Sequence, residues 1–186
     1  MARELPVRDE VIITGIGGQG IQLMAKTLAL AATRGGLQAM LSSDVGGEMR
    51  GGPSQASVVV DDQQLRALPI LPSARSAVVM HHKHSAFALD RLVPGGLALV
   101  NSSVADPAAI RDAEVVAVPA LDLARAADAP NAAGFVMLGA YATLRRIVDI
   151  AALGDAMREL VPPYRAQHVA ANLRALEAGA GTVLTA

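Results

Sequence analysis

Two glycine-rich segments carry the residue types best suited to holding an anion. The first is Gly-Ile-Gly-Gly-Gln-Gly at residues 15–20, directly after the apolar residues 11–13. In a G-x-G-x-x-G turn, the first glycine permits the turn, the second lets backbone approach a pyrophosphate, and the third allows close packing. The N–H groups that open the following helix then face the anion with the positive end of the helix dipole. The segment predicts a phosphate-binding turn, and close packing alone is the alternative.

Two other kinds of nucleotide-binding site have a glycine spacing that the same turn matches. Gly15 and Gly20 have the spacing of a Walker A loop, but Ile21 stands where that loop needs lysine, which excludes it. A dinucleotide site needs an acidic residue about 20 residues further on to hold the ribose. Asp44 lies near that offset and is equally suited to a turn. A free-standing NAD-binding dehydrogenase therefore stays open as an interpretation.

The second segment, residues 42–54, contains four glycines, one proline and three charged residues. It follows neither the helical nor the strand period, so we expect a long ordered loop, a kind of loop that is often functional. Arg50 either pairs with Glu48 or offers its planar guanidinium to a phosphate or carboxylate. The adjacent Gly51 and Gly52 favour the second interpretation, because they let backbone come close to a ligand.

Other residue types give no catalytic or metal site. His81, His82 and His84 lie close together, but Lys83 interrupts them and no acidic or cysteine ligand is adjacent, so we expect no metal. The serines of residues 42–54 lack the context of a nucleophile. We therefore predict no catalytic residue in this chain.

The elements that must position these residues alternate between strands and helices. Apolar runs predict a strand entering the first turn and further strands at 37–41, 56–60, 76–80, 97–100 and 114–118. Helical spacing predicts a helix from Ile21 and others at 85–92, 120–127, 135–142, 150–160 and 163–178, with Asn131 as an N-cap and 135–142 buried on all sides. This pattern predicts a single Rossmann-like domain over residues 1–186, a doubly wound α/β fold with a mainly parallel sheet covered on both faces. The carboxyl ends of its strands should bring together the turn at 15–20, the loop at 42–54 and the residues after Met80.

Composition narrows the class of partner. The chain has 16 basic and 17 acidic residues and neither a basic block nor an aromatic ladder, which argues against nucleic acid. It has no cysteine, so any iron–sulfur cluster must lie on another chain. The amino terminus is charged, and no run reaches the about 18 apolar residues of a membrane span, so we expect a cytoplasmic protein without membrane association. Hydrophobic residues make up 52% and charged residues 18%, which indicates either buried subunit interfaces or a bias toward alanine.

The two glycine motifs together are more specific than either alone. Residues 15–20, followed by Gly-Glu-Met-Arg-Gly-Gly-Pro-Ser at 47–54, resemble the gamma subunit of 2-oxoacid:ferredoxin (acceptor) oxidoreductases. That family's pattern is roughly G-x-G-G-Q-G and then P-E-x-R-G-G-x-S, and Gly47 stands where many members have proline. Residues 118–120, 131, 137–140 and 172–179 are also similar, so the resemblance covers nearly the whole chain.

The resemblance implies a subunit that is not catalytic alone. The complex would be a thiamine-diphosphate enzyme that oxidatively decarboxylates a 2-oxoacid to an acyl-CoA. Alpha, beta and ferredoxin-like (delta) partners would hold the thiamine diphosphate and the iron–sulfur clusters. Coenzyme A would contact this chain at the residues of the two motifs: Gly15, Gly17, Gly18, Gln19, Gly20, Arg50, Gly51, Gly52 and Ser54. The beta subunit of an indolepyruvate oxidoreductase, which also carries an R-G-G loop, stays open as an alternative.

Overall fold

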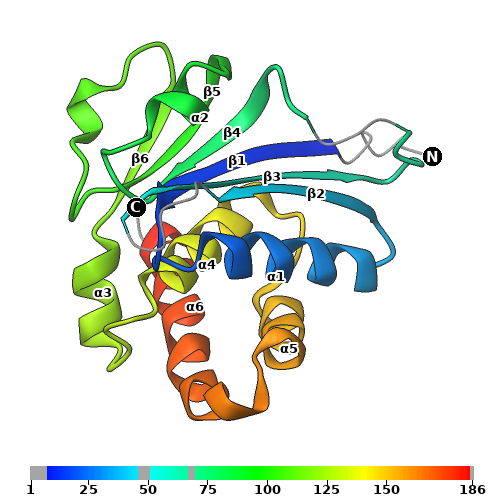
Figure 1. Cartoon of the computed structure of the whole chain (residues 1–186), viewed down its shortest axis with the longest axis vertical. Coiled ribbons are helices and arrows are strands. Elements are labelled where there is room, and N and C mark those ends of the chain that lie inside the picture. The colour runs from blue at the N-terminus through cyan, green and yellow to red at the C-terminus, as the bar shows by residue number, and fades with distance from the viewer. Residues whose placement is uncertain (1–7, 46–50, 67–69, 185–186) are drawn as a thin grey trace.

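The structure is a computed structural model that describes residues 8–45, 51–66 and 70–184. Its centre is a six-stranded sheet in the order β2-β3-β1-β4-β5-β6 (Figure 1). The strands are β1 (Arg8–Ile16), β2 (Gln38–Val45), β3 (Pro53–Asp61), β4 (Ala74–Val79), β5 (Leu92–Asn101) and β6 (Glu114–Val118). The helices are α1 (Ile21–Arg34), α2 (Ala86–Leu89), α3 (Ala120–Ala126), α4 (Ala133–Arg145), α5 (Ile150–Leu160) and α6 (Val169–Leu184), with short 3-10 turns η1 (Pro107–Ala109) and η2 (Pro163–His168).

The sheet is mostly parallel, as predicted, with one reversed strand. β1 pairs in parallel with β4, β4 with β5, and β5 with β6, whereas β3 is antiparallel to both β1 and β2. β2 and β3 therefore form a hairpin, and β3 separates β2 from β1. The prediction of a loop over 42–54 is wrong at both ends, because β2 continues to Val45 and β3 begins at Pro53. Serine and aspartate have weak strand propensity, but here their backbone groups are satisfied by the ladder to β3.

The two faces of the sheet are covered unequally. Side chains alternate along β1, so that Val11 and Ile13 belong to the large core beneath α1, α4, α5 and α6, while Ile12 belongs to a small cluster beneath α2. Figure 1 shows the four longer helices packed on one side of the sheet and α2 on the other. Both faces are covered, as predicted, but one of them carries most of the core.

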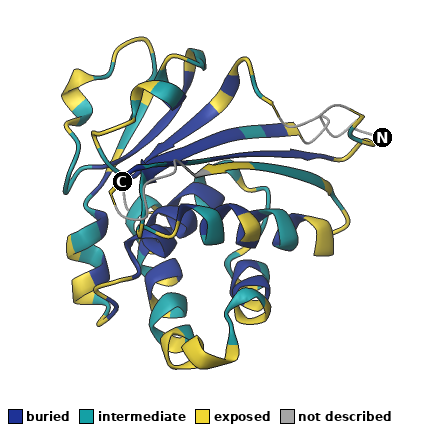
Figure 2. Ribbon diagram, in the orientation of Figure 1, coloured by how far each residue is buried: buried dark blue, intermediate teal, exposed yellow. Residues whose placement is uncertain are grey.

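Helix α4 is the buried centre of the helical layer. Its ten residues from Ala133 to Ala142 are all buried, which confirms the expectation of a helix surrounded on every side (Figure 2). It crosses α6 at very short range. A Cβ atom added to Gly139 would lie 2.1 Å from the carbonyl oxygen of Leu176, and one added to Gly179 would lie 1.9 Å from that of Val136. The two glycines therefore let the helix backbones touch.

Three predicted boundaries are wrong for local reasons. Asn131 does not cap α4; the N-cap is Ala132, without a side-chain bond, because Asn131 belongs to the turn in which the Ala132 N–H donates to the Ala129 carbonyl. Helix α2 is only four residues long, since the chain from Leu92 already pairs with β4 at Ala74. The last predicted helix is divided: residues 163–168 form η2, and α6 begins at Val169.

Candidate functional site

The two glycine-rich segments meet at the carboxyl end of β1. Gly15 lies opposite Ser54 in the antiparallel ladder, and the Gly17 N–H donates to the Gly52 carbonyl over 2.9 Å. The predicted gathering of the turn with the start of β3 is therefore present in the described part of both segments. Arg50, which completed the predicted site, lies outside the described residues.

The backbone of the turn leaves some donors open and uses others. Since the Gly17 N–H is bonded to Gly52, it is not free for a ligand. Gly18 and Gly20 have φ angles of 97° and 77°, and their N–H groups donate to no group among the described residues. Gly20 is also the N-cap of α1, without a side-chain bond. The positive end of the helix dipole is thus exposed beside two open donors.

The glycines of the second segment differ from one another. Gly51 is exposed, with a φ angle of 76°, whereas Gly52 is buried and accepts the bond from Gly17. Ser54 is buried within β3. Of this group, only Gly51 offers an exposed backbone.

Gly15 and Gln19 build the turn itself. A Cβ atom on Gly15 would lie 2.5 Å from the Gln19 side-chain oxygen and 3.0 Å from the Met80 Cβ, so a larger residue does not fit. The Gln19 oxygen accepts the Ile16 N–H at 2.9 Å, and its Nε2 donates to the Met80 carbonyl at 3.3 Å. The Gln19 amide therefore ties the turn to Met80 at the end of β4, the residue that precedes the segment predicted to gather here.

Replacing Gln19 with alanine is expected to lower the free energy of unfolding by about 1–2 kcal/mol, because the partly buried Ile16 N–H loses its acceptor. Urea unfolding measures the loss, and hydrogen exchange at the Ile16 amide should accelerate. The matched control is Gln64→Ala, at an exposed glutamine. Unchanged exchange at Ile16 in the Gln19 variant would contradict this role.

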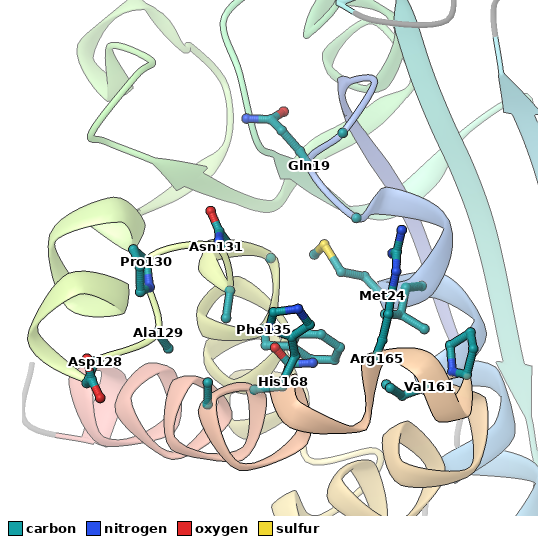
Figure 3. Close-up of a pocket in the computed structure, with 18 residues that line it drawn as sticks. Gln19, Met24, Asp128, Ala129, Pro130, Asn131, Phe135, Val161, Arg165 and His168 are labelled. Atoms are coloured by element: carbon teal, nitrogen blue, oxygen red, sulfur yellow. The ribbon is translucent and has the colours of Figure 1, made fainter.

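A cavity of about 390 Å³ opens beside the turn (Figure 3). The turn forms one wall of the cavity, and the connection from α3 to α4 forms a second. The third wall consists of the end of α5, η2 and the start of α6. Its lining is Gly18, Gln19, Gly20, Leu23, Met24, Asp128, Ala129, Pro130, Asn131, Ala132, Gly134, Phe135, Val161, Pro162, Arg165, His168, Ala171 and Asn172. The volume lies in the range typical of small-molecule sites.

Of the predicted site residues that the structure describes, only Gly18, Gln19 and Gly20 line this cavity. Sequence analysis missed its far wall, because η2 is about 145 residues beyond the turn and carries no motif. The signal available was limited to Arg165 and His168 following the Pro162-Pro163 pair. Their approach to the turn depends on the crossing of α4 and α6, which no local pattern encodes.

A family model described as pyruvate ferredoxin/flavodoxin oxidoreductase matches residues 10–182. The chain belongs to this family. The resemblance inferred from the two glycine motifs is confirmed, and within the family the chain corresponds to the gamma subunit of a 2-oxoacid:ferredoxin oxidoreductase.

Members of the oxidoreductase family align with the chain over nearly its full length. The 2-oxoglutarate synthase subunit KorC of Methanothermobacter thermautotrophicus is 32% identical over 94% of this chain and 95% of its own. The crystal structure of a keto/oxoacid ferredoxin oxidoreductase gamma subunit from Geobacter sulfurreducens superposes with a TM-score of 0.76, at 26% identity, over 96% of this chain and 99% of its own. These relatives are subunits of oxidoreductase complexes.

A longer oxidoreductase chain contains the same fold. The 2-oxoglutarate:ferredoxin oxidoreductase of Magnetococcus marinus, solved with 2-oxoglutarate, coenzyme A and succinyl-CoA bound, superposes with a TM-score of 0.84 at 18% identity. The match covers 96% of this chain and 31% of that one. In that enzyme the fold is one part of a larger polypeptide.

The structure argues against a dinucleotide site in which Asp44 holds the ribose. Asp44 lies on β2, which β3 separates from β1, and its carboxylate accepts from Gln55 Nε2 at 3.2 Å. In a dinucleotide fold the second strand is adjacent to the first, so that its terminal acid reaches the ribose. The hairpin removes that adjacency.

The histidines at the end of β4 make local bonds. His81 Nδ1 accepts the Lys83 N–H at 3.1 Å, and His82 Nδ1 lies 2.8 Å from the Val104 carbonyl. Burial, followed by the neighbouring charges of His82 and Lys83, lowers the pKa of His81, which favours its neutral form. No group of three or more histidine, aspartate or glutamate side chains is arranged to hold a metal ion within residues 8–45, 51–66 and 70–184.

No helix within the described part of this family member is long and apolar enough to cross a membrane. Asn101 is fully buried; its Nδ2 donates to the Met80 carbonyl at 3.2 Å, and its oxygen accepts the Ala120 N–H at 3.2 Å. Asn101 thus joins the ends of β4 and β5 to the start of α3, which stiffens the edge of the sheet that carries the turn.

Proposed function

We propose that this chain helps to bind coenzyme A in a cytoplasmic, thiamine-diphosphate-dependent complex that oxidatively decarboxylates a 2-oxoacid to an acyl-CoA. The observation that carries the proposal is the pair of open N–H groups at Gly18 and Gly20, which lie at the positive end of α1 beside the cavity. Backbone donors at a helix N-terminus bind phosphate oxygens well. Coenzyme A brings such phosphates to the complex.

The rigidity of the turn supports the same role. Gln19 bonds to Ile16 and Met80, and Gly17 bonds to Gly52, so the conformation of the turn is set before a ligand arrives. A donor set that is already ordered loses little conformational entropy when it binds an anion. In this proposal the turn orients the coenzyme, and the chain takes no part in bond making.

Partner subunits would supply the redox chemistry. The chain has no cysteine, so it offers no thiolate to an iron–sulfur cluster. We assign the thiamine diphosphate and the clusters to alpha, beta and ferredoxin-like (delta) partners. When bound there, the thiamine diphosphate supplies the carbanion chemistry of decarboxylation and the clusters carry the electrons away. The chain's own residues would hold the phosphate end of the acyl acceptor.

Replacing Arg50 with alanine is expected to weaken coenzyme A binding to the assembled complex by about tenfold or more, because one charge-assisted contact to phosphate is lost. Isothermal titration calorimetry with coenzyme A measures the change. The matched control is Arg66→Ala, at an exposed arginine that follows β3 and does not line the cavity. Unchanged affinity in the Arg50 variant would count against placing coenzyme A at the two motifs.

A further inference from the structure

The far wall of the cavity presents an unpaired cation. Arg165 lies on η2, and its guanidinium forms no ion pair with any carboxylate of the described residues. Its Cζ atom lies 5.6 Å from the centre of the neighbouring Tyr164 ring. In Figure 3 the side chain extends from η2 toward the start of α1. Arg165 is the only arginine or lysine among the described lining residues, and it points at the same end of the helix as the open N–H groups of the turn.

The carboxylate in the described lining has a cation beside it. Asp128 is the only carboxylate among the described lining residues; its side chain is 98% exposed, and Arg174 approaches its Oδ2 at 3.4 Å. The same guanidinium donates to the carbonyls of Ala127 and Asp128 at 2.8 and 2.9 Å, so it is held in place. Two other arginines of the helical layer are also paired, Arg34 with Glu159 and Arg158 with Asp155. Arg165 is exposed and has no carboxylate partner among the described residues, so its charge is available to an anionic ligand.

Beside the polar side chains of Gln19, Asn131 and Asn172, the cavity has an apolar part. Met24 and Phe135 are nearly fully buried and expose only an edge to it, and Val161, Pro130 and Pro162 continue the same surface. Such a lining favours a flat, weakly polar group, because burying a polar group there without a partner costs free energy. A ligand that fits both features has anionic groups joined to a ring system.

We propose that Arg165, assisted by His168, binds a phosphate of the nucleotide end of coenzyme A, with the adenine in the apolar part of the cavity. This inference rests on the proposed function, since it states which end of the coenzyme enters. Coenzyme A has an anionic nucleotide at one end and a neutral thiol arm at the other, and a cationic wall discriminates in favour of the first. The thiol arm then points out of the cavity, toward the partner subunits where the acyl group is formed.

The test is calorimetry on the assembled complex with three probes: coenzyme A, adenosine 3′,5′-bisphosphate and pantetheine. Arg165→Ala is expected to raise the Kd for coenzyme A and for the bisphosphate by about tenfold each, and to leave any binding of pantetheine unchanged. The salt dependence of both affected affinities should become shallower, because one phosphate contact is lost. Arg165→Lys should recover part of the affinity. The KM for the 2-oxoacid should not change.

Matched variants separate this inference from the proposed function. Arg66→Ala removes an exposed arginine away from the cavity and should change none of these affinities. If Arg50→Ala weakens coenzyme A binding and Arg165→Ala does not, the coenzyme lies at the turn and the assignment to the cavity is overturned. If neither variant changes the affinity, both proposals fail. An equal loss for pantetheine and the bisphosphate in Arg165→Ala would also overturn the assignment, because it would show no preference for the nucleotide end.

Discussion

Replacing Gly179 with alanine is expected to lower the free energy of unfolding by about 3 kcal/mol or more. The added Cβ would lie 1.9 Å from the Val136 carbonyl oxygen and 2.7 Å from its carbon, which are backbone atoms of α4 and cannot move aside by a rotamer change. The only relief is a separation of α4 from α6. Because α4 is buried along ten consecutive residues, that separation would open the core on several sides.

Urea unfolding followed by circular dichroism measures the loss. Gly139→Ala tests the same crossing from the other helix, where the nearest atom is the Leu176 carbonyl oxygen at 2.1 Å. The matched control is Gly181→Ala, in the same helix as Gly179 but with nothing within 4 Å of the added atom. There the helix propensity of alanine should raise stability by about 0.5–1 kcal/mol. Equal stabilities of the Gly179 and Gly181 variants would refute the account of the crossing.

The second large effect is expected at a buried carboxylate. Replacing Asp9 with alanine should lower the free energy of unfolding by about 3 kcal/mol. Asp9 is 2% exposed on β1; it accepts the Tyr141 hydroxyl, and its Oδ1 lies 3.0 Å from Arg145 Nε. Without the carboxylate, a fully buried hydroxyl and a half-buried guanidinium lose their partner on the strand. Chemical unfolding of Asp9→Ala, Tyr141→Phe and the double variant measures the coupling, and strictly additive losses would contradict it.

The same contact predicts a loss of stability in alkali. Burial, and then the charge of Asp9 and the hydrogen bond to it, raise the pKa of Tyr141 well above its usual value of 10.0. The unfolded chain therefore releases this proton above about pH 10 while the folded chain keeps it, so the stabilisation present below that pH is lost as pH rises. The contribution amounts to about 1.4 kcal/mol per pH unit. Subtracting the unfolding free energies of Tyr141→Phe from those of the wild type between pH 9 and 11 isolates it, and a flat difference would contradict the prediction.

Local patterns were sufficient for the elements of the parallel half of the sheet. The apolar run before Gly15 and the helical spacing after Ile21 predicted β1, the turn and α1, because strand and helix periods depend on which face is buried. The buried character of α4 also followed from its residues alone. The hairpin did not, because Ser42 and Asp44 have weak strand propensity and become strand only by pairing with β3.

For the candidate site too, the sequence was sufficient for one part and the tertiary structure was needed for the rest. The sequence by itself determined the family, through two glycine motifs, and the position of the glycine turn at the start of α1, because both depend on residues that are neighbours in the chain. Only the tertiary structure decided that Gln19 is used to hold the turn, that β3 removes Asp44 from it, and that Arg165 faces it across a cavity. Each of these contacts joins residues far apart in sequence. The first exists because β4 pairs beside β1, the second because β3 is inserted beside β1, and the third because two glycines let α6 cross α4. None of these arrangements leaves a periodic or local signal.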